Sequence, residues 1–376
     1  MGPPEESADS SADSSAEVPA SAAPRAPHLA GVGEIDSFAE LIDVRSPSEF
    51  ALDHIPGAIN LPVLDDGERA LVGTVHAKDS PFAARRLGSA MVARNIARHL
   101  EESLRDRPRT WRPLVYCWRG GQRSGAFTFV LTQVGWPARR LEGGYKAWRR
   151  RVLEDLDSLP TRLRLQVVHG PTGSGKTAFL AAAAAQGAQV LDLEGLARHR
   201  GSVLGAHDLL EEGEPQPSQR AFETAIHAAL RRFDPARPVF VEAESRRIGR
   251  LGIPGALFAA MRSSPGIALE VPIEERVRYL VQDYGALFPR TEALRTQLER
   301  LVPLHGARQV ALWCELASAS AWDELARDLV QRHYDPAYRR GAGAGAGSAD
   351  VVQLARLDEE SLARAAAEAM VRLGAR

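Results

Sequence analysis

The sequence has few of the features on which several classes of protein depend. It contains 2 cysteines in 376 residues, too few for a disulfide framework in a chain of this length, so we expect a reduced, cytoplasmic protein. No run of about 18 apolar residues is present, so we expect no membrane-spanning helix. The start of the chain lacks the basic and apolar regions of a signal peptide. A formal net charge of −1 gives no overall attraction to nucleic acid, so RNA binding would need local patches.

Lysine is also scarce. Of the 47 lysines and arginines, only Lys78, Lys146 and Lys176 are lysines. The abundance of arginine makes arginine clusters weak signals on their own. It makes the position of Lys176, inside a glycine-rich segment, more informative.

Strand-like and helix-like patterns alternate along most of the chain, which is typical of parallel α/β sheets. The apolar run at 113–117 predicts a buried strand, and helical spacing follows it to about Gly135. LQVVH at 165–169 predicts the first strand of a second unit. We expect a disordered tail over 1–32, an α/β domain over 33–153, a linker over 154–162, a second α/β domain over 163–340, a flexible Gly/Ala spacer over 341–350 and a C-terminal helix over 351–376.

The segment YCWRGGQRSG places a cysteine between a strand and a helix. A thiol becomes a good nucleophile as a thiolate, which backbone N–H groups and a helix N-terminus stabilise. The glycines allow the backbone to curl into a nest for an anion. We therefore predict that Cys117 is catalytic. The predicted nest around it comprises Arg119, Gly120, Gly121, Gln122, Arg123 and Ser124.

The upstream segment DVRSPSEFALDHIPGAINLP resembles the N-terminal signature of the rhodanese family. The resemblance implies a rhodanese-like parallel-sheet domain in which Cys117 carries the transferred atom. It also implies that Asp43 and Arg45 help to organise the site, although both could serve only to stabilise the fold. Common rhodaneses place an arginine five residues after the cysteine, whereas Arg123 lies six after Cys117.

The longer spacing suits a tetrahedral anion such as phosphate or selenophosphate. Dual-specificity phosphatases share the Cys-x5-Arg spacing, so phosphatase chemistry is an alternative. Tyr116, which stands where those phosphatases have histidine, argues against it.

The segment GPTGSGKT follows a predicted strand and precedes a predicted helix, the context of a P-loop. Its backbone N–H groups would cradle phosphates, Lys176 would reach the outer ones, and the Thr177 hydroxyl is a candidate Mg²⁺ ligand. The predicted phosphate-binding residues are Gly170, Gly173, Ser174, Gly175, Lys176 and Thr177. Four acidic residues near strand ends are candidates for the same site, and each could instead be a solvated charge: Asp192, Glu194, Glu242 and Glu244.

Six segments in this order together resemble the tRNA 2-selenouridine synthase family. They are YCWRGGQRSG, LEGGYKAWRR, GPTGSGKT, DLEGLARHRGSVLG, VEAESRRIG and YDPAY. The implied fold is a rhodanese-like domain followed by a P-loop NTPase-like α/β domain. The implied enzyme is a transferase that geranylates 2-thiouridine at the tRNA wobble position with geranyl diphosphate, and then exchanges the geranylthio group for selenium from selenophosphate. The alternative is a rhodanese-type sulfurtransferase fused to a nucleotide-binding regulatory domain.

The resemblance implies tRNA as a partner and selenophosphate synthase as a candidate second one. We expect no tightly bound cofactor, with Mg²⁺ as a candidate ion. The resemblance also implies His199 and Arg200 as RNA contacts. Arg246 and Arg247 are further predicted contacts, because arginines pair with phosphates.

Overall fold

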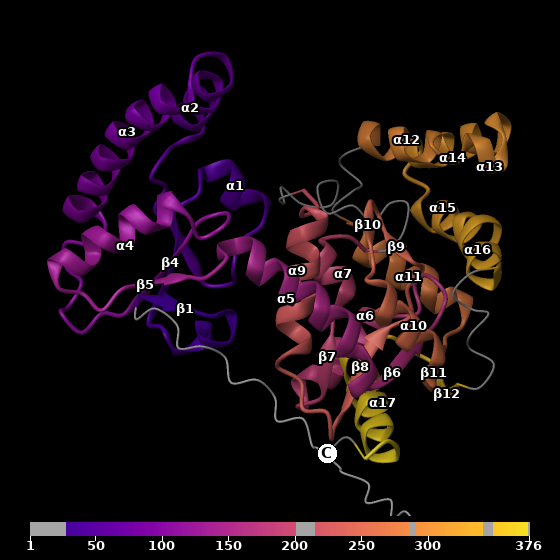
Figure 1. Ribbon diagram of the computed structural model, residues 1–376. Coiled ribbons are helices and arrows are strands. Elements are labelled where there is room, and N and C mark those ends of the chain that lie inside the picture. Colours follow the sequence, from indigo (N-terminus) through magenta and orange to yellow (C-terminus); the bar gives the residue numbers. More distant parts are fainter. Residues whose placement is uncertain (1–27, 201–214, 286–290, 341–348, 375–376) are drawn as a thin grey trace, which may run out of the picture.

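The computed structural model describes residues 28–200, 215–285, 291–340 and 349–374, and its described part contains two parallel sheets (Figure 1). The predicted tail lies outside the described residues up to position 27, as does most of the predicted Gly/Ala spacer. The two α/β units agree with the fold class predicted from the sequence. None of the helices in the described ranges is long and apolar enough to cross a membrane.

The N-terminal sheet has five parallel strands in the order β1-β5-β4-β2-β3. Its strands are β1 (Leu29–Ala30), β2 (Glu40–Asp43), β3 (Ala58–Asn60), β4 (Pro113–Tyr116) and β5 (Arg139–Leu141). Its helices are η1 (Val32–Ser37), α1 (Pro47–Leu52), α2 (Asp66–Lys78), α3 (Pro81–Glu102), α4 (Gln122–Val134) and α5 (Gly144–Ser158). The tail predicted over 1–32 includes residues that belong to the sheet. Leu29 and Ala30 form β1 and pair with β5, and Ala30 is fully buried.

The second sheet also has five parallel strands, in the order β12-β11-β6-β8-β7. Its strands are β6 (Arg164–His169), β7 (Gln189–Leu191), β8 (Pro238–Glu242), β11 (Gly266–Glu270) and β12 (Asp350–Gln353). The helices around it are α6 (Lys176–Ala185), α7 (Leu193–Ala197), α9 (Gln219–Leu230), α10 (Gly255–Ser263) and α17 (Glu359–Arg372). The segment predicted as only a C-terminal helix therefore begins with the end of edge strand β12, and α17 then packs on α6.

A helical subdomain and a short hairpin complete the second unit. The hairpin pairs β9 (Arg247–Ile248) with β10 (Leu251–Gly252) in antiparallel fashion. The subdomain comprises α11 (Ile273–Asp283), α12 (Thr291–Glu299), α13 (Val302–His305), α14 (Ala307–Ser318), α15 (Trp322–Leu329), the π-helical turn η4 (Val330–Tyr334) and α16 (Asp335–Arg340). Part of it packs around the fully buried Trp313.

The linker predicted over 154–162 is helical for most of its length, and the two units meet in a packed interface. Helix α5 runs to Ser158, and the short helix η2 (Pro160–Arg162) follows it. Trp148 on α5 belongs to one buried cluster with Phe222 and Ile226 on α9, and Figure 1 shows these two helices side by side between the sheets. The helical form of α5 brings Trp148 and Leu156 onto one face. Burying this apolar face against the second unit stabilises the helix.

Polar bonds reinforce this interface. The Tyr145 hydroxyl donates to Asp53 Oδ2 at 2.6 Å, and Thr224 Oγ1 from the second unit donates to the same oxygen at 3.1 Å. His227 Nε2 lies 2.9 Å from an oxygen of Asp155. Each of these polar side chains is buried or nearly so, so their pairing removes a penalty that unpaired groups would carry.

Candidate functional site

The predicted nucleophile ends the middle strand of the first sheet. Cys117 directly follows β4 and is 3% exposed. Its Sγ lies 3.1 Å from Ser124 Oγ, and Ser124 Oγ is in turn within 3.3 Å of the Gly121 carbonyl, to which it donates. Helix α4 begins at Gln122, immediately after the loop. The loop thus presents a thiol and a helix N-terminus to the same small region, as an anion site requires.

Close backbone contacts determine the shape of the cysteine loop. Tyr145 N donates to the Cys117 carbonyl at 2.9 Å, so the start of α5 lies against the loop. Gly144 has φ +58°, and a Cβ there would be 2.2 Å from the Cys117 carbonyl oxygen. Gly120 has φ +64°, and its Cβ would be 2.5 Å from the Leu141 carbonyl oxygen. Only glycine fits these two positions, because side chains rarely adopt that backbone region and the space is already filled.

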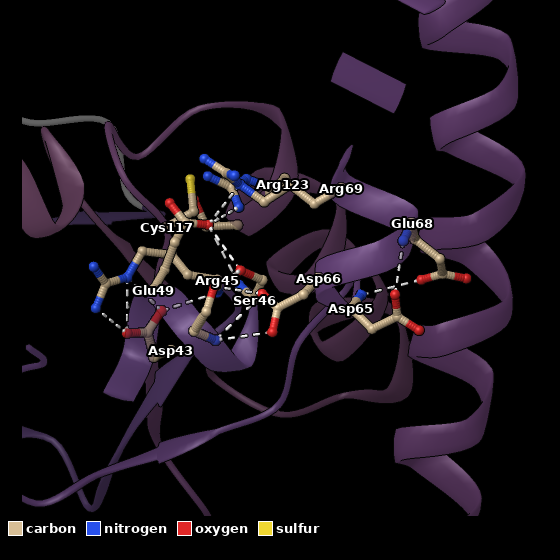
Figure 2. Close-up of polar contacts among 12 residues, drawn as sticks. Asp43, Arg45, Ser46, Glu49, Asp65, Asp66, Glu68, Arg69, Cys117 and Arg123 are labelled. Carbon is tan, nitrogen blue, oxygen red and sulfur yellow. Dashed lines mark hydrogen bonds and ion pairs between the residues drawn. The ribbon is translucent and has the colours of Figure 1, made fainter. Parts of the chain in front are cut away.

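The two arginines of the predicted nest occupy different surroundings. Arg123 Nη1 donates to Glu49 Oε2 at 3.0 Å, and the same oxygen pairs with Arg69 at 2.9 Å; Figure 2 shows both arginines directed at Glu49. Burial disfavours the charge of Glu49, but the bond from Arg123 and the charges of both arginines outweigh it, so its pKa is lowered. Arg119 is exposed and lines a separate cavity of about 610 Å³ with Lys146 and others. Glu49, which no motif of the sequence marks as part of the site, therefore competes with any anion for Arg123.

Asp43 and Arg45 form a buried ion pair beneath the site (Figure 2). Arg45 also donates to the Asp53 carbonyl at 2.7 Å, and its guanidinium carbon lies 4.0 Å from the centroid of the Tyr145 ring. Burial works against the charge of Arg45, but the bond and charge of Asp43 outweigh it, so the pKa of Arg45 is raised. These partners favour the fold-stabilising interpretation, since they tie β2 to α5 and to the interface.

The P-loop follows β6, the middle strand of the second sheet, and leads into α6. Gly173 and Gly175 have φ of +82° and +74°, and a Cβ at either would lie 2.9 Å from a leucine side chain. Lys176 Nζ donates to the Gly170 carbonyl at 2.9 Å, which draws it back across the loop. Ser174 is buried, and its hydroxyl has no hydrogen-bond partner among the described residues. The loop has the curled form and the free donor that a phosphate group would use.

Three of the four predicted acidic residues cluster next to the P-loop, with Glu242 fully buried and Glu194 and Glu244 half-buried. Thr177 Oγ1 donates to Glu194 Oε2 at 3.2 Å, and Glu194 N donates to Glu242 Oε1 at 2.8 Å. Burial, followed by the charges of Glu194 and Asp192, raises the pKa of Glu242 to about 8. Burial, followed by the charge of Glu194, also raises the pKa of Glu244 well above its ordinary value. Asp192 instead caps α7, accepting from Gly195 N at 2.7 Å.

A cavity of about 650 Å³ opens in front of the P-loop. Its walls include Glu194, Glu244 and four tyrosines, Tyr279, Tyr284, Tyr334 and Tyr338. Glu242, at the end of β8, is fully buried and does not line this cavity, whereas Glu244 does. The two glutamates therefore have different roles.

The YDPAY segment ties the helical subdomain to the P-loop. Asp335 pairs with Arg276 at 2.6 Å, and Arg276 donates to the Thr172 carbonyl at 2.7 and 3.0 Å. Tyr334 and Tyr338 line the cavity. The sequence of this segment does not indicate that role, because only the fold brings residues 334–338 next to residue 172.

The predicted RNA contacts separate into two groups. His199 is 8% exposed, which leaves little surface for RNA. Arg200 pairs with Asp283 at 2.7 Å and lines the P-loop cavity. Arg246 and Arg247 are exposed at the β9 hairpin, so they alone of the four present a free basic surface to a large ligand.

The residues around Thr177 fit Mg²⁺ only as an ion shared with a ligand. Thr177 and Glu194 offer the oxygen donors that Mg²⁺ prefers. Within the described ranges, however, no group of three or more His, Cys, Asp or Glu side chains is arranged to hold a metal by itself. Phosphate oxygens and water would have to supply the other ligands.

Comparisons with known proteins match both units. The family model of the rhodanese-like domain matches residues 31–151, and that of the tRNA 2-selenouridine synthase AAA domain matches residues 163–300. The chain is 38% identical over 259 residues to the tRNA 2-selenouridine synthase of Nitrosomonas europaea, covering 68% of this chain and 66% of the relative. It is 38% identical over 280 residues to the protein of that name from Nitrosomonas eutropha, covering 72% and 69%. The matches thus span about two thirds of these relatives' length.

Among solved structures, the N-terminal domain of an ATP/GTP-binding protein from Clostridium difficile is similar to one third of the chain. The two are 30% identical, and the match covers 33% of this chain and 98% of that one. The TM-score is 0.30.

Proposed function

The chain belongs to the tRNA 2-selenouridine synthase family, and we propose that it converts 2-thiouridine at the tRNA wobble position to 2-selenouridine in two stages. One observation carries the proposal. A single chain holds two loops suited to phosphate-like anions, each after the middle strand of a parallel sheet, and a buried interface fixes the two units against each other. A reaction with two phosphorylated substrates, geranyl diphosphate and selenophosphate, needs two such loops.

In the first stage the sulfur of 2-thiouridine attacks C1 of geranyl diphosphate. The C1–O bond breaks, diphosphate leaves with the bonding electrons, and the base releases its N3 proton to water. The P-loop amides and Lys176 bind the charge that develops on the leaving group, which is the stage at which such contacts accelerate a reaction. Lys176 would exchange its bond to the Gly170 carbonyl for one to a phosphate oxygen.

Thr177 and Glu194 would hold a Mg²⁺ that arrives with the diphosphate, and the ion would neutralise part of the leaving group's charge. The neutral form of Glu242 favoured by burial limits the negative charge beside the loop. A fully ionised carboxylate cluster would repel diphosphate.

In the second stage selenophosphate delivers selenium to C2 of the base. S-geranyl-2-thiouridine, selenophosphate and water give 2-selenouridine, geranylthiol and phosphate, so no oxidant or reductant is required. We assign this stage to the nest around Cys117. Arg123 would turn from Glu49 to the selenophosphate oxygens, and Ser124 would orient the thiol.

Reconstitution with purified protein tests the proposal. The tRNA anticodon stem-loop containing 2-thiouridine is incubated first with geranyl diphosphate and then with selenophosphate, and its nucleosides are analysed by mass spectrometry. The account predicts S-geranyl-2-thiouridine followed by 2-selenouridine. Lys176→Ala should slow the first step strongly, whereas Lys78→Ala, which changes an exposed lysine on α2, should not.

If neither nucleoside forms, while the protein transfers sulfur from thiosulfate to cyanide, the sulfurtransferase alternative replaces the proposal. Release of phosphate from a phosphorylated substrate without change to the RNA would favour the phosphatase alternative. In both cases, comparing the activities of the Lys176→Ala and Lys78→Ala variants shows whether the P-loop contributes to that reaction.

A further inference from the structure

An apolar pocket lies beside the P-loop cavity, between helices of the subdomain. Its walls are formed mainly by Leu280, Leu294, Trp322, Leu325, Ala326 and Leu329. It shares Thr172, Leu280, Tyr284 and Tyr334 with the P-loop cavity. The two spaces are therefore neighbours, with a phosphate-binding loop at one end and hydrocarbon side chains at the other.

The size of this space, here called the tail pocket, limits what can enter it. Its volume is about 60 Å³, and one water-sized group needs about 10–15 Å³ measured in the same way. The pocket thus accepts about four to six groups of that size, which matches the five carbons of one isoprene unit. The nearer part of a longer chain would lie in the larger cavity beside the tyrosines.

The chemistry of the tail pocket favours a hydrocarbon over a nucleobase. Leucine, tryptophan and alanine side chains offer almost no hydrogen-bond partners to the edge of a base. A base buried there would leave polar groups unpaired, which costs about 1–3 kcal/mol for each group. Aliphatic carbons have no such penalty and gain from leaving water.

The position of the tail pocket relative to the P-loop is fixed. Arg276 on α11 bonds to the Thr172 carbonyl and to Asp335 at the start of α16. Arg327 on α15 pairs with Glu274 on α11 at 2.5 Å. The helices that form the pocket are thereby held to one another and to the loop, so the distance between the two ends is built into the fold.

We propose that the tail pocket holds the terminal isoprene unit of a prenyl diphosphate whose diphosphate is bound by the P-loop, and that it limits the length of the chain that is transferred. This inference rests on the proposed function, in which the P-loop serves the diphosphate substrate. It adds the residues that select a hydrocarbon tail and its length.

The test compares the binding of pyrophosphate and of dimethylallyl, geranyl and farnesyl diphosphates by calorimetry. Ala326→Phe puts a ring into the pocket, and Ala311→Phe makes the same change at an exposed position on α14. Ala326→Phe should weaken geranyl diphosphate binding about tenfold to a hundredfold and leave pyrophosphate binding unchanged. Ala311→Phe should bind every ligand as the unmodified protein does.

A second variant covers the case in which Ala326→Phe does not fold. Val281→Ala enlarges the half-buried wall of the pocket and should raise the affinity for farnesyl diphosphate relative to geranyl diphosphate. If both variants bind geranyl and farnesyl diphosphate with the same relative affinities as the unmodified protein, the proposed role of the tail pocket is wrong.

Different results would contradict the tail pocket and the proposed function. A protein that geranylates tRNA but whose geranyl diphosphate affinity does not respond to Ala326→Phe retains its proposed function and loses the tail pocket. A protein that binds ATP but no prenyl diphosphate, and geranylates no tRNA, contradicts both.

Discussion

Glu242 provides a quantitative test of the carboxylate cluster beside the P-loop. It ends β8, it is 0% exposed, and its Oε2 has no hydrogen-bond partner among the described residues. Burial, with the charges of Glu194 and Asp192, raises its pKa from 4.5 to about 8. The perturbation is Glu242→Gln, which keeps the shape of the protonated side chain and removes its ability to ionise.

The sign of the effect follows from proton binding. Between the two pKa values the folded protein keeps the Glu242 proton and the unfolded chain releases it, so the stabilisation present at low pH is lost as the pH rises. One pKa unit is worth about 1.4 kcal/mol, so the free energy of unfolding should fall by roughly 3–4 kcal/mol between pH 5 and pH 8 through this group. The glutamine variant should not show that fall. It should be close to the unmodified protein at pH 5 and more stable at pH 8.

Urea unfolding at pH 5, 6, 7 and 8, without phosphate ligands, measures the difference. Glu299→Gln, which changes an exposed glutamate on α12, is the matched control and should follow the unmodified protein. Parallel stability curves for the unmodified protein and Glu242→Gln would refute the reasoning, because they would show that Glu242 ionises alike in the folded and unfolded states.

Three further predictions concern the cysteine loop and the interface. Glu49→Gln should tighten phosphate binding at the cysteine loop about two- to fivefold by releasing Arg123 from its partner; calorimetry with inorganic phosphate checks this, and weaker binding would contradict it. Gly144→Ala should lower the free energy of unfolding by about 1–3 kcal/mol and impair selenation, because its Cβ would meet the Cys117 carbonyl. Gly73→Ala, where a Cβ meets nothing, is its control, and equal stability of the two variants would argue against the loop geometry described above. Trp148→Ala should cost roughly 3–5 kcal/mol in denaturant unfolding, since it removes a buried side chain shared by both units; a loss below about 1 kcal/mol would mean that the interface contributes little.

The fold class could be predicted because its signals are local. The apolar run at 113–117 and the strand before the P-loop each show their type in a few residues, and both form middle strands. Helix α4 ends at Val134, next to a glycine with φ +106°, close to the predicted end near Gly135.

The missed elements depend on partners far away in the chain. Leu29 and Ala30 are a strand only because β5 lies beside them, and Asp350–Gln353 only because β11 does. The predicted linker over 154–162 is helical for most of its length because its apolar residues pack against distant elements such as α9.

The same distinction applies to the candidate sites. Cys117 and the P-loop glycines stand in motifs whose spacing is visible in the sequence. The partner of Arg123 is 74 positions away in the chain, and Arg200 bonds to a residue 83 positions away. Such distant contacts leave no periodic pattern in the sequence. The roles of Glu49, Arg276 and the cavity tyrosines can therefore be seen only in the folded structure.

The division of labour between the two loops is the central claim, and one measurement tests it most directly. Cys117→Ala is given thiolated anticodon stem-loop, geranyl diphosphate and selenophosphate together, and the nucleosides are identified by mass spectrometry. Cys314→Ala, at the half-buried cysteine of α14, is the control. The account predicts that Cys117→Ala accumulates S-geranyl-2-thiouridine without 2-selenouridine, while Cys314→Ala makes both. Formation of 2-selenouridine by Cys117→Ala, or loss of geranylation in a folded Cys117→Ala protein, would contradict it.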